Sequence, residues 1–71
     1  MITAAELDNW FTYHAPKEGD QERYVAIRNA AKEFAAVIVT NTIPCADQTA
    51  AIRLVRQAAM TANQSIACGG K

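Results

Sequence analysis

The sequence predicts an all-α fold with one domain, residues 1–71, in which a short N-terminal helix precedes an antiparallel two-helix hairpin. Two alanine-rich stretches, 20–41 and 46–67, repeat apolar side chains at steps of three and four, which is typical of helices. A proline-containing break separates them, and so short a connection favours an antiparallel hairpin whose helices associate further through their apolar faces. A capping pattern and a later proline delimit a further helix near the N-terminus.

The first helix is predicted over residues 3–11. Thr3 is a suitable N-cap, and Glu6 stands three residues later as the partner that completes a capping box. Its larger apolar side chains fall on one face: Leu7, Trp10 and Phe11. Pro16 favours an extended backbone just before it and closes this segment.

The second helix is predicted over residues 20–41, with Asp20 as its N-cap. Its main buried stripe is predicted to contain Tyr24, Ile27, Ala31, Phe34 and Ile38. Smaller apolar residues flank this stripe on both sides and leave only a narrow polar arc. A helix that is apolar over so much of its circumference needs more than one neighbour.

The third helix is predicted over residues 46–67. Cys45 takes the N-cap position that serine often occupies, with Gln48 three residues later, and Gly69-Gly70 ends the helix. Its core stripe is predicted to contain Ile52, Val55, Ala59, Ala62 and Ile66. Cys45 and Cys68 would then lie about 33 Å apart at ~1.5 Å per residue, too far for a disulfide, so both thiols are predicted to be free.

A chain of 71 residues has a small core, which by itself supplies only about 3–5 kcal/mol of stability. Because alanine buries little area, we expect the chain to self-associate. Seven acidic and seven basic residues give a net charge of zero, which argues against binding to long nucleic acid but leaves room for a small nucleotide. No signal peptide or membrane-spanning stretch is evident, so we expect a soluble, cytosolic protein.

Four ring side chains within five positions are followed by a proline: Trp10, Phe11, Tyr13, His14 and Pro16. One interpretation makes Trp10 and Phe11 a hydrophobic plug at the open end of the hairpin. Tyr13 and His14 lie beyond the predicted helix and need not face the core. Tyr13 is therefore a candidate for stacking on a nucleobase, an interaction worth about 1–3 kcal/mol.

Arg28 and Lys32 lie one helical turn apart, at the edge of the buried stripe rather than on the polar arc. They could pair with an acid from another helix or subunit, or they could bind a phosphate, to which the planar fork of arginine is suited. Arg53 and Arg56 are interpreted as surface or intersubunit charges. No metal-ligand spacing, activated nucleophile or glycine-rich phosphate loop is present, so we expect neither enzymatic activity nor a cofactor.

Four segments together resemble the small phage-encoded anti-CBASS sponge proteins, which share a helical hairpin with one family of Thoeris anti-defence sponges. They are Phe11-Thr-Tyr13-His14-Ala-Pro16, Tyr24-x-x-Ile27-Arg28-x-x-Ala31, Ile43-Pro44 and Ala62-Asn63-x-x-Ile66-Ala67. The resemblance spans nearly the whole chain, and the Phe-x-Tyr-His-x-Pro segment is its most specific part.

The resemblance implies a non-catalytic protein that binds cyclic dinucleotides such as cyclic GMP-AMP and withholds these second messengers of CBASS immunity from their effectors. It implies a hexamer, built as a trimer of dimers, with cyclic dinucleotides between protomers and cyclic trinucleotides at separate sites in some members. The location implied is the cytoplasm of the phage-infected bacterium.

By position, the resemblance implies that Tyr13 corresponds to the family's stacking tyrosine and that Arg28 corresponds to its phosphate-binding basic residue. The full set of candidate ligand-binding residues is Phe11, Tyr13, His14, Pro16, Arg28 and Lys32. Candidates for a second ligand site are Asn63, Ser65 and Gly69. The alternative function is a helical-hairpin adaptor or inhibitor that docks its apolar face on a host protein, with Trp10 and Phe11 as anchors.

Overall fold

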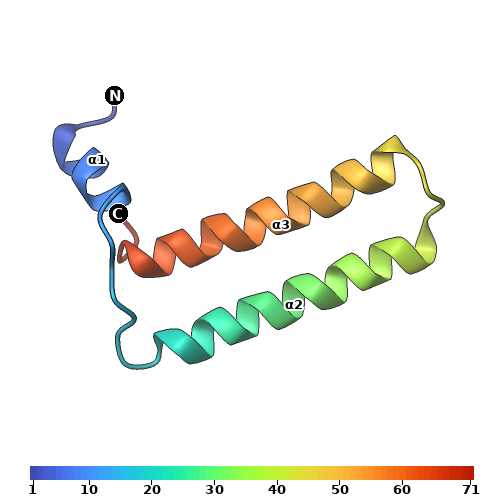
Figure 1. Cartoon of the computed structure of the whole chain (residues 1–71), viewed down its shortest axis with the longest axis horizontal. Coiled ribbons are helices and arrows are strands. Elements are labelled where there is room, and N and C mark those ends of the chain that lie inside the picture. Colours follow the sequence, from blue (N-terminus) through green and yellow to red (C-terminus); the bar gives the residue numbers. More distant parts are fainter.

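The computed structural model describes residues 1–71 and contains three helices and no strand. They are α1 (Ala4–Trp10), α2 (Asp20–Asn41) and α3 (Ala46–Ala67). Helices α2 and α3 run antiparallel and side by side, and α1 lies at the open end of this hairpin, close to the C-terminus (Figure 1). The predicted all-α hairpin with a short N-terminal helix is confirmed.

The predicted capping box at the start of α1 is present. Thr3 Oγ1 accepts a hydrogen bond from the Glu6 backbone N–H at 3.1 Å, and Glu6 Oε1 accepts one from the Thr3 N–H at 3.2 Å. Two of the N–H groups that a helix start leaves without partners are thereby satisfied. This short helix therefore begins where the sequence predicts.

The prediction that Asp20 is the N-cap of α2 is wrong. Gly19 holds that position with a φ of 85°, and Asp20 is the first helical residue. The Asp20 carboxylate instead accepts a hydrogen bond from the Lys17 N–H at 2.8 Å and lies 3.8 Å from Arg23. Glycine adopts this left-handed backbone at little cost, so the turn places the carboxylate one position later than expected.

Both predicted ends of α3 are confirmed. Cys45 Sγ accepts a hydrogen bond from the Gln48 N–H at 3.5 Å. At the other end the Gly70 N–H bonds to the Ser65 carbonyl at 2.8 Å and the Gly69 N–H to the Ile66 carbonyl at 3.2 Å. This pattern, with φ of 64° and 80° at the two glycines, is a Schellman motif. Both cysteines are free, as predicted.

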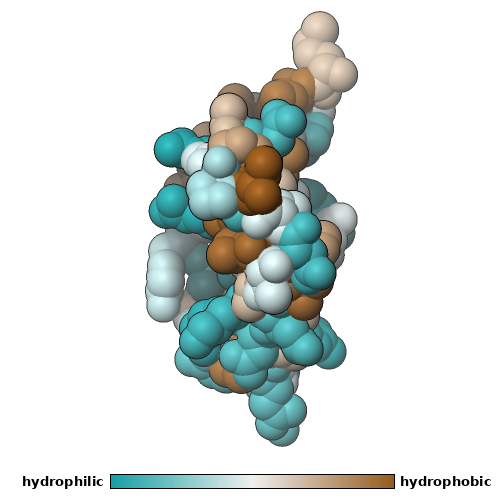
Figure 2. Space-filling model, turned by 90° about the vertical axis from the view of Figure 1, so that its right-hand side faces the viewer, coloured by the Kyte–Doolittle hydropathy of each residue, from teal (hydrophilic) through white to brown (hydrophobic).

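The molecule is a single layer of helices. It measures 44 × 31 × 14 Å, and its shortest dimension is close to the roughly 10–12 Å diameter of one helix. The radius of gyration is 15.1 Å, against about 11 Å for a compact domain of this length. Viewed from the end where α2 connects to α3, apolar side chains lie at the surface among polar ones (Figure 2).

A single layer has no interior, so the stripe predicted to be buried on α2 is only half-covered. Only Cys68 and Asp20 are buried in the whole chain. Tyr24, Ile27 and Ile38 are partly exposed, and Phe34 is 58% exposed, which contradicts its predicted place in a core. Two helices cover each other along one line of contact, and side chains beside that line meet solvent. No helix is long and apolar enough to span a membrane.

Because one chain buries so little, its stability should depend on protein concentration. A hundredfold increase in concentration should raise the midpoint of thermal unfolding by roughly 5–10 °C, through mass action on an associated folded state. Circular dichroism melts over that range measure the effect. A midpoint that does not move with concentration would show that the isolated hairpin is self-sufficient.

Candidate functional site

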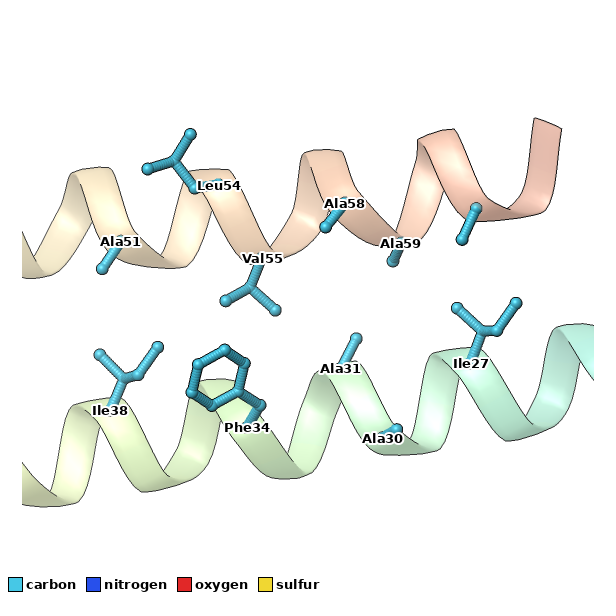
Figure 3. A pocket seen from close by; sticks show the side chains of 11 residues that line it. Ile27, Ala30, Ala31, Phe34, Ile38, Ala51, Leu54, Val55, Ala58 and Ala59 are labelled. Atoms are coloured by element: carbon cyan, nitrogen blue, oxygen red, sulfur yellow. The ribbon is translucent and has the colours of Figure 1, made fainter. Parts of the chain in front are cut away.

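Two hollows lie on opposite sides of the line along which α2 meets α3, and they differ in chemistry. We call the first the apolar groove: it encloses about 710 Å³ and all 11 of its lining residues are hydrophobic. Figure 3 shows Phe34 and Val55 pointing toward the opposite helix across it. Phe34 is 58% and Leu54 66% exposed, so this apolar surface is open in the single chain.

The apolar groove cannot orient a phosphate, because no charged or polar side chain lines it. Several of its lining residues are alanines, among them Ala30, Ala51, Ala58 and Ala62. Small side chains of this kind let another helix approach closely, and contiguous exposed apolar surface marks interaction sites. The groove therefore suits a packing surface better than a nucleotide site.

The second hollow, which we call the cationic groove, encloses about 300 Å³. It shares Ala31, Val55 and Ala59 with the apolar groove, which places the two hollows on the two flanks of one line of contact. Its polar and aromatic lining is made of Tyr24, Arg28, Lys32, Arg56 and Asn63. The structure thus brings Arg28 and Lys32, both predicted from the sequence, into one hollow.

The cations of this groove have no acidic partner within the chain. The single ion pair of the structure joins Arg23 to Asp20 at 3.8 Å. Arg28, Lys32 and Arg56 therefore bring three positive charges to one hollow of a chain whose net charge is zero. Because no acid of the chain neutralises these charges, an anion in the groove would be attracted to all three.

Arg56 and Tyr24 are groove residues that the sequence interpretation missed. The sequence pattern predicts a surface or intersubunit charge at Arg56 and a place in a buried stripe for Tyr24. A signal was present for Arg56, since it lies four residues after Ile52 and three before Ala59, which are both on the predicted core stripe. The partial exposure of Tyr24 depends on how the two helices are rotated against each other.

Asn63 lies in the cationic groove, and its side-chain carbonyl oxygen is buried without a hydrogen-bond donor in the chain. Ser65 lines a different hollow near the C-terminus and donates to the Ala62 carbonyl at 2.7 Å, and Gly69 lines neither hollow. The three residues proposed for a second ligand site are therefore not gathered into one hollow. Of these, Asn63 alone joins the cations.

Residues 10–16, which carry the four ring side chains and which we call the ring segment, lie at the open end of the hairpin, before α2 begins (Figure 1). Tyr13 and Phe11 are each 84% exposed, and Pro16 is exposed as well. Phe11 is therefore not a plug within one chain: α1 ends at Trp10, and the ring that follows lies in solvent. Trp10 is half-buried, and its Nε1–H donates to the Lys71 carbonyl at 2.9 Å.

His14 is partly buried, with Nε2 2.6 Å from the Asn9 carbonyl oxygen, to which it donates. One ring nitrogen is thus used within the chain. Neither His14 nor Tyr13 lines the cationic groove of its own chain. The rings and the cations predicted to share a ligand therefore occupy separate parts of one chain.

A family model described as "Acb2/Tad1, hairpin domain" matches residues 3–67, from the capping box of α1 to the last turn of α3. This match confirms the resemblance seen in the motifs. No curated protein and no solved structure matches the chain.

The groove chemistry predicts stabilisation by simple phosphate. Inorganic phosphate should raise the unfolding midpoint by a few degrees more than sodium chloride at equal ionic strength, because a divalent anion that binds the three cations binds only the folded chain. Replacing Arg28 with alanine should remove the difference between the two salts.

The matched control is Arg53→Ala, which removes an exposed arginine outside the cationic groove. This variant should keep the full phosphate effect. If phosphate and chloride act alike on the unchanged protein, the grouping of cations has no affinity for phosphate.

Proposed function

The chain belongs to the Acb2/Tad1 hairpin family of sponge-type binding proteins for cyclic nucleotides, and we propose that it sequesters cyclic dinucleotides such as cyclic GMP-AMP. In this role it is a phage anti-defence protein that withholds the messengers of CBASS immunity from their effectors in the cytoplasm of the infected bacterium. It binds its ligand without transforming it.

The observation that carries this proposal is the group of three unpaired cations in the cationic groove. Arg28, Lys32 and Arg56 converge on one hollow in a chain with no net charge, so the positive potential is local. Such a hollow favours a compact ligand with few phosphates over a long polyanion. A cyclic dinucleotide, with two phosphates in one ring, has this form.

The bases of the ligand need flat apolar partners, and Tyr13 supplies an exposed ring. Because Tyr13 does not line the cationic groove of its own chain, the complete site forms between chains. A two-fold pair of protomers presents two tyrosines and two sets of cations, which matches two bases and two phosphates. Phe11, His14 and Pro16 extend the ring wall of this composite site.

The proposed assembly follows from the apolar surface that a single chain leaves exposed. A slab 14 Å thick with an open apolar groove of about 710 Å³ gains stability when a second copy packs on it. We propose a homo-oligomer, a hexamer arranged as a trimer of dimers, as the form that binds messengers. Cyclic trinucleotides are a further ligand class, with Asn63 as the residue of the second-site set that lies among the cations.

The second candidate is an adaptor or inhibitor that covers its apolar groove with a host protein. The solvent exposure of Phe34 and Leu54 favours this second function, since both side chains are more than half exposed in the single chain. In that case the chain would be a monomer without its partner and would carry no nucleotide. Heat denaturation of the purified protein, followed by mass spectrometry of the supernatant, separates the two functions.

Binding is tested by isothermal titration calorimetry with a panel of cyclic di- and trinucleotides. Tyr13→Ala should weaken cyclic dinucleotide binding about 5- to 160-fold, through loss of stacking worth about 1–3 kcal/mol. Arg28→Ala should weaken it about 10- to 100-fold, through loss of a charge-assisted hydrogen bond. Arg53→Ala is the control and should bind normally. No heat of binding from any member of the panel would refute the proposed function.

Assembly is tested by Leu54→Glu, which places a charge in the apolar groove at a side chain that is 66% exposed. Burying that charge costs several kcal/mol, so light scattering should show dissociated chains. Val39→Glu is the matched control, since Val39 is 54% exposed and lines neither groove. Equal effects of the two substitutions would argue against the apolar groove as the packing surface.

A further inference from the structure

All hydrogen bonds that join distant parts of the sequence connect the end of α1 to the end of α3. The bonds within α2 and α3 and at their turns link residues close in sequence. Four bonds form the long-range set: Asn9 Nδ2 to the Cys68 carbonyl at 3.3 Å, Trp10 Nε1 to the Lys71 carbonyl at 2.9 Å, Gln64 Nε2 to the Trp10 carbonyl at 3.2 Å, and Cys68 Sγ to the Asn9 carbonyl at 3.6 Å. We call these residues the end latch.

The N-terminal arm, which is the part of the chain before α2, has few other contacts that fix it to the hairpin. Helix α1 has seven residues, and isolated helices shorter than about 12–15 residues are marginal in water. Apolar burial contributes little, because Ile2 is 57%, Leu7 47% and Phe11 84% exposed. The position of α1 on the hairpin therefore depends on the end latch and on the half-buried ring of Trp10.

The same bonds reach the segment that carries Tyr13. The Asn9 carbonyl accepts from the Cys68 thiol and also from His14 Nε2 at 2.6 Å. On the other side of the tyrosine, the Thr12 hydroxyl donates to the Asp8 carbonyl. Both neighbours of Tyr13 are thus bonded to the last turn of α1, which the latch fixes to α3.

We propose that Asn9, Gln64 and Cys68 are positioning residues for Tyr13. They do not touch the ligand; they hold the exposed phenol at a defined place relative to the hairpin, so that little freedom is lost when a base stacks on it. The part of this inference that concerns the ligand rests on the proposed function, whereas the latch itself does not.

The chain contains built-in reporters for the latch. Cys68 is 7% exposed and belongs to it, while Cys45 is exposed at the far end of α3, and both are free thiols. Trp10 is the only tryptophan. A thiol reagent therefore labels Cys45 as an internal reference and Cys68 only when the latch opens, and tryptophan emission reports the surroundings of α1.

The first test compares Gln64→Ala with Gln57→Ala, the same substitution at an exposed position of α3 that makes no side-chain hydrogen bond and lines neither groove. In the Gln64→Ala variant, the thiol reagent should label Cys68 about tenfold faster, and tryptophan emission should shift to the red. The labelling rate of Cys45 and the helix content should not change. Asn9→Ala, a change outside α3, should do the same.

The latch is refuted if Cys68 in the unchanged protein reacts as fast as Cys45, or if neither Gln64→Ala nor Asn9→Ala accelerates its labelling. If one of these two variants loses helix content, the labelling rate of Cys68 in the other variant decides whether the latch exists. Gln57→Ala should behave as the unchanged protein, and acceleration by this control would attribute the effect to general destabilisation of α3 and overturn the assignment.

The second test is a double-mutant cycle for cyclic GMP-AMP affinity. Gln64→Ala alone should weaken binding about 3- to 10-fold, and it should have no further effect in a Tyr13→Ala background, because the residue acts through that ring. Additive losses would overturn the positioning role. If the unchanged protein binds no cyclic nucleotide, the proposed function and the ligand part fail together, while the labelling rates still decide whether the latch exists.

Discussion

Contact between two helices along a single line is the constraint on which this structure depends. In a slab 14 Å thick, α2 and α3 can cover only the side chains that face each other, and they cover these only in part. The two buried residues, Cys68 and Asp20, lie instead at the ends of these helices. Ala31, Val55 and Ala59 line both grooves and lie along the contact line, and the side chains beside them belong to one flank or to the outer surface. The two grooves on these flanks are therefore open to solvent, because the chain has no interior.

The two flanks are made chemically different by small shifts of helical spacing. On α2, Ala30 and Phe34 line the apolar groove, whereas Arg28 and Lys32 line the cationic groove. A residue that is one or two positions away along the helix lies on the other flank, since each step rotates the side chain by about 100°. One thin hairpin can thus offer a surface for assembly and a surface for an anion at the same time.

The hairpin and its N-terminal arm are held by different forces. Helices α2 and α3 are joined by apolar contact and by their short connection, without a hydrogen bond between them along their length. The arm is joined by polar contacts at Asn9, Trp10 and Gln64, with its apolar side chains largely in solvent. Apolar contact tolerates rotation and sliding, whereas hydrogen bonds set direction. A polar attachment is therefore suited to orienting an exposed ring such as Tyr13.

The sequence by itself determined the helices, the caps of α1 and α3, and the family, whereas the N-cap of α2 is Gly19 and not the predicted Asp20. The Thr3–Glu6 capping box, the Cys45 cap and the Gly69-Gly70 stop are encoded by residues within a few positions of one another, and so are the periodicity and the motif from Phe11 to Pro16. Arg28 and Lys32 were also placed together from the sequence, because they lie one turn apart on one helix.

Only the tertiary structure decided which other residues share the cationic groove with Arg28 and Lys32, and which side chains remain exposed. Arg56 and Asn63 reach the cationic groove from the other helix, Phe34 lies in the open, and the end of α3 bonds to the end of α1. These outcomes depend on the rotation of one helix against another and on where a separate arm docks. Both are set by packing between segments about 25 to 60 residues apart in the sequence, and no local pattern specifies them.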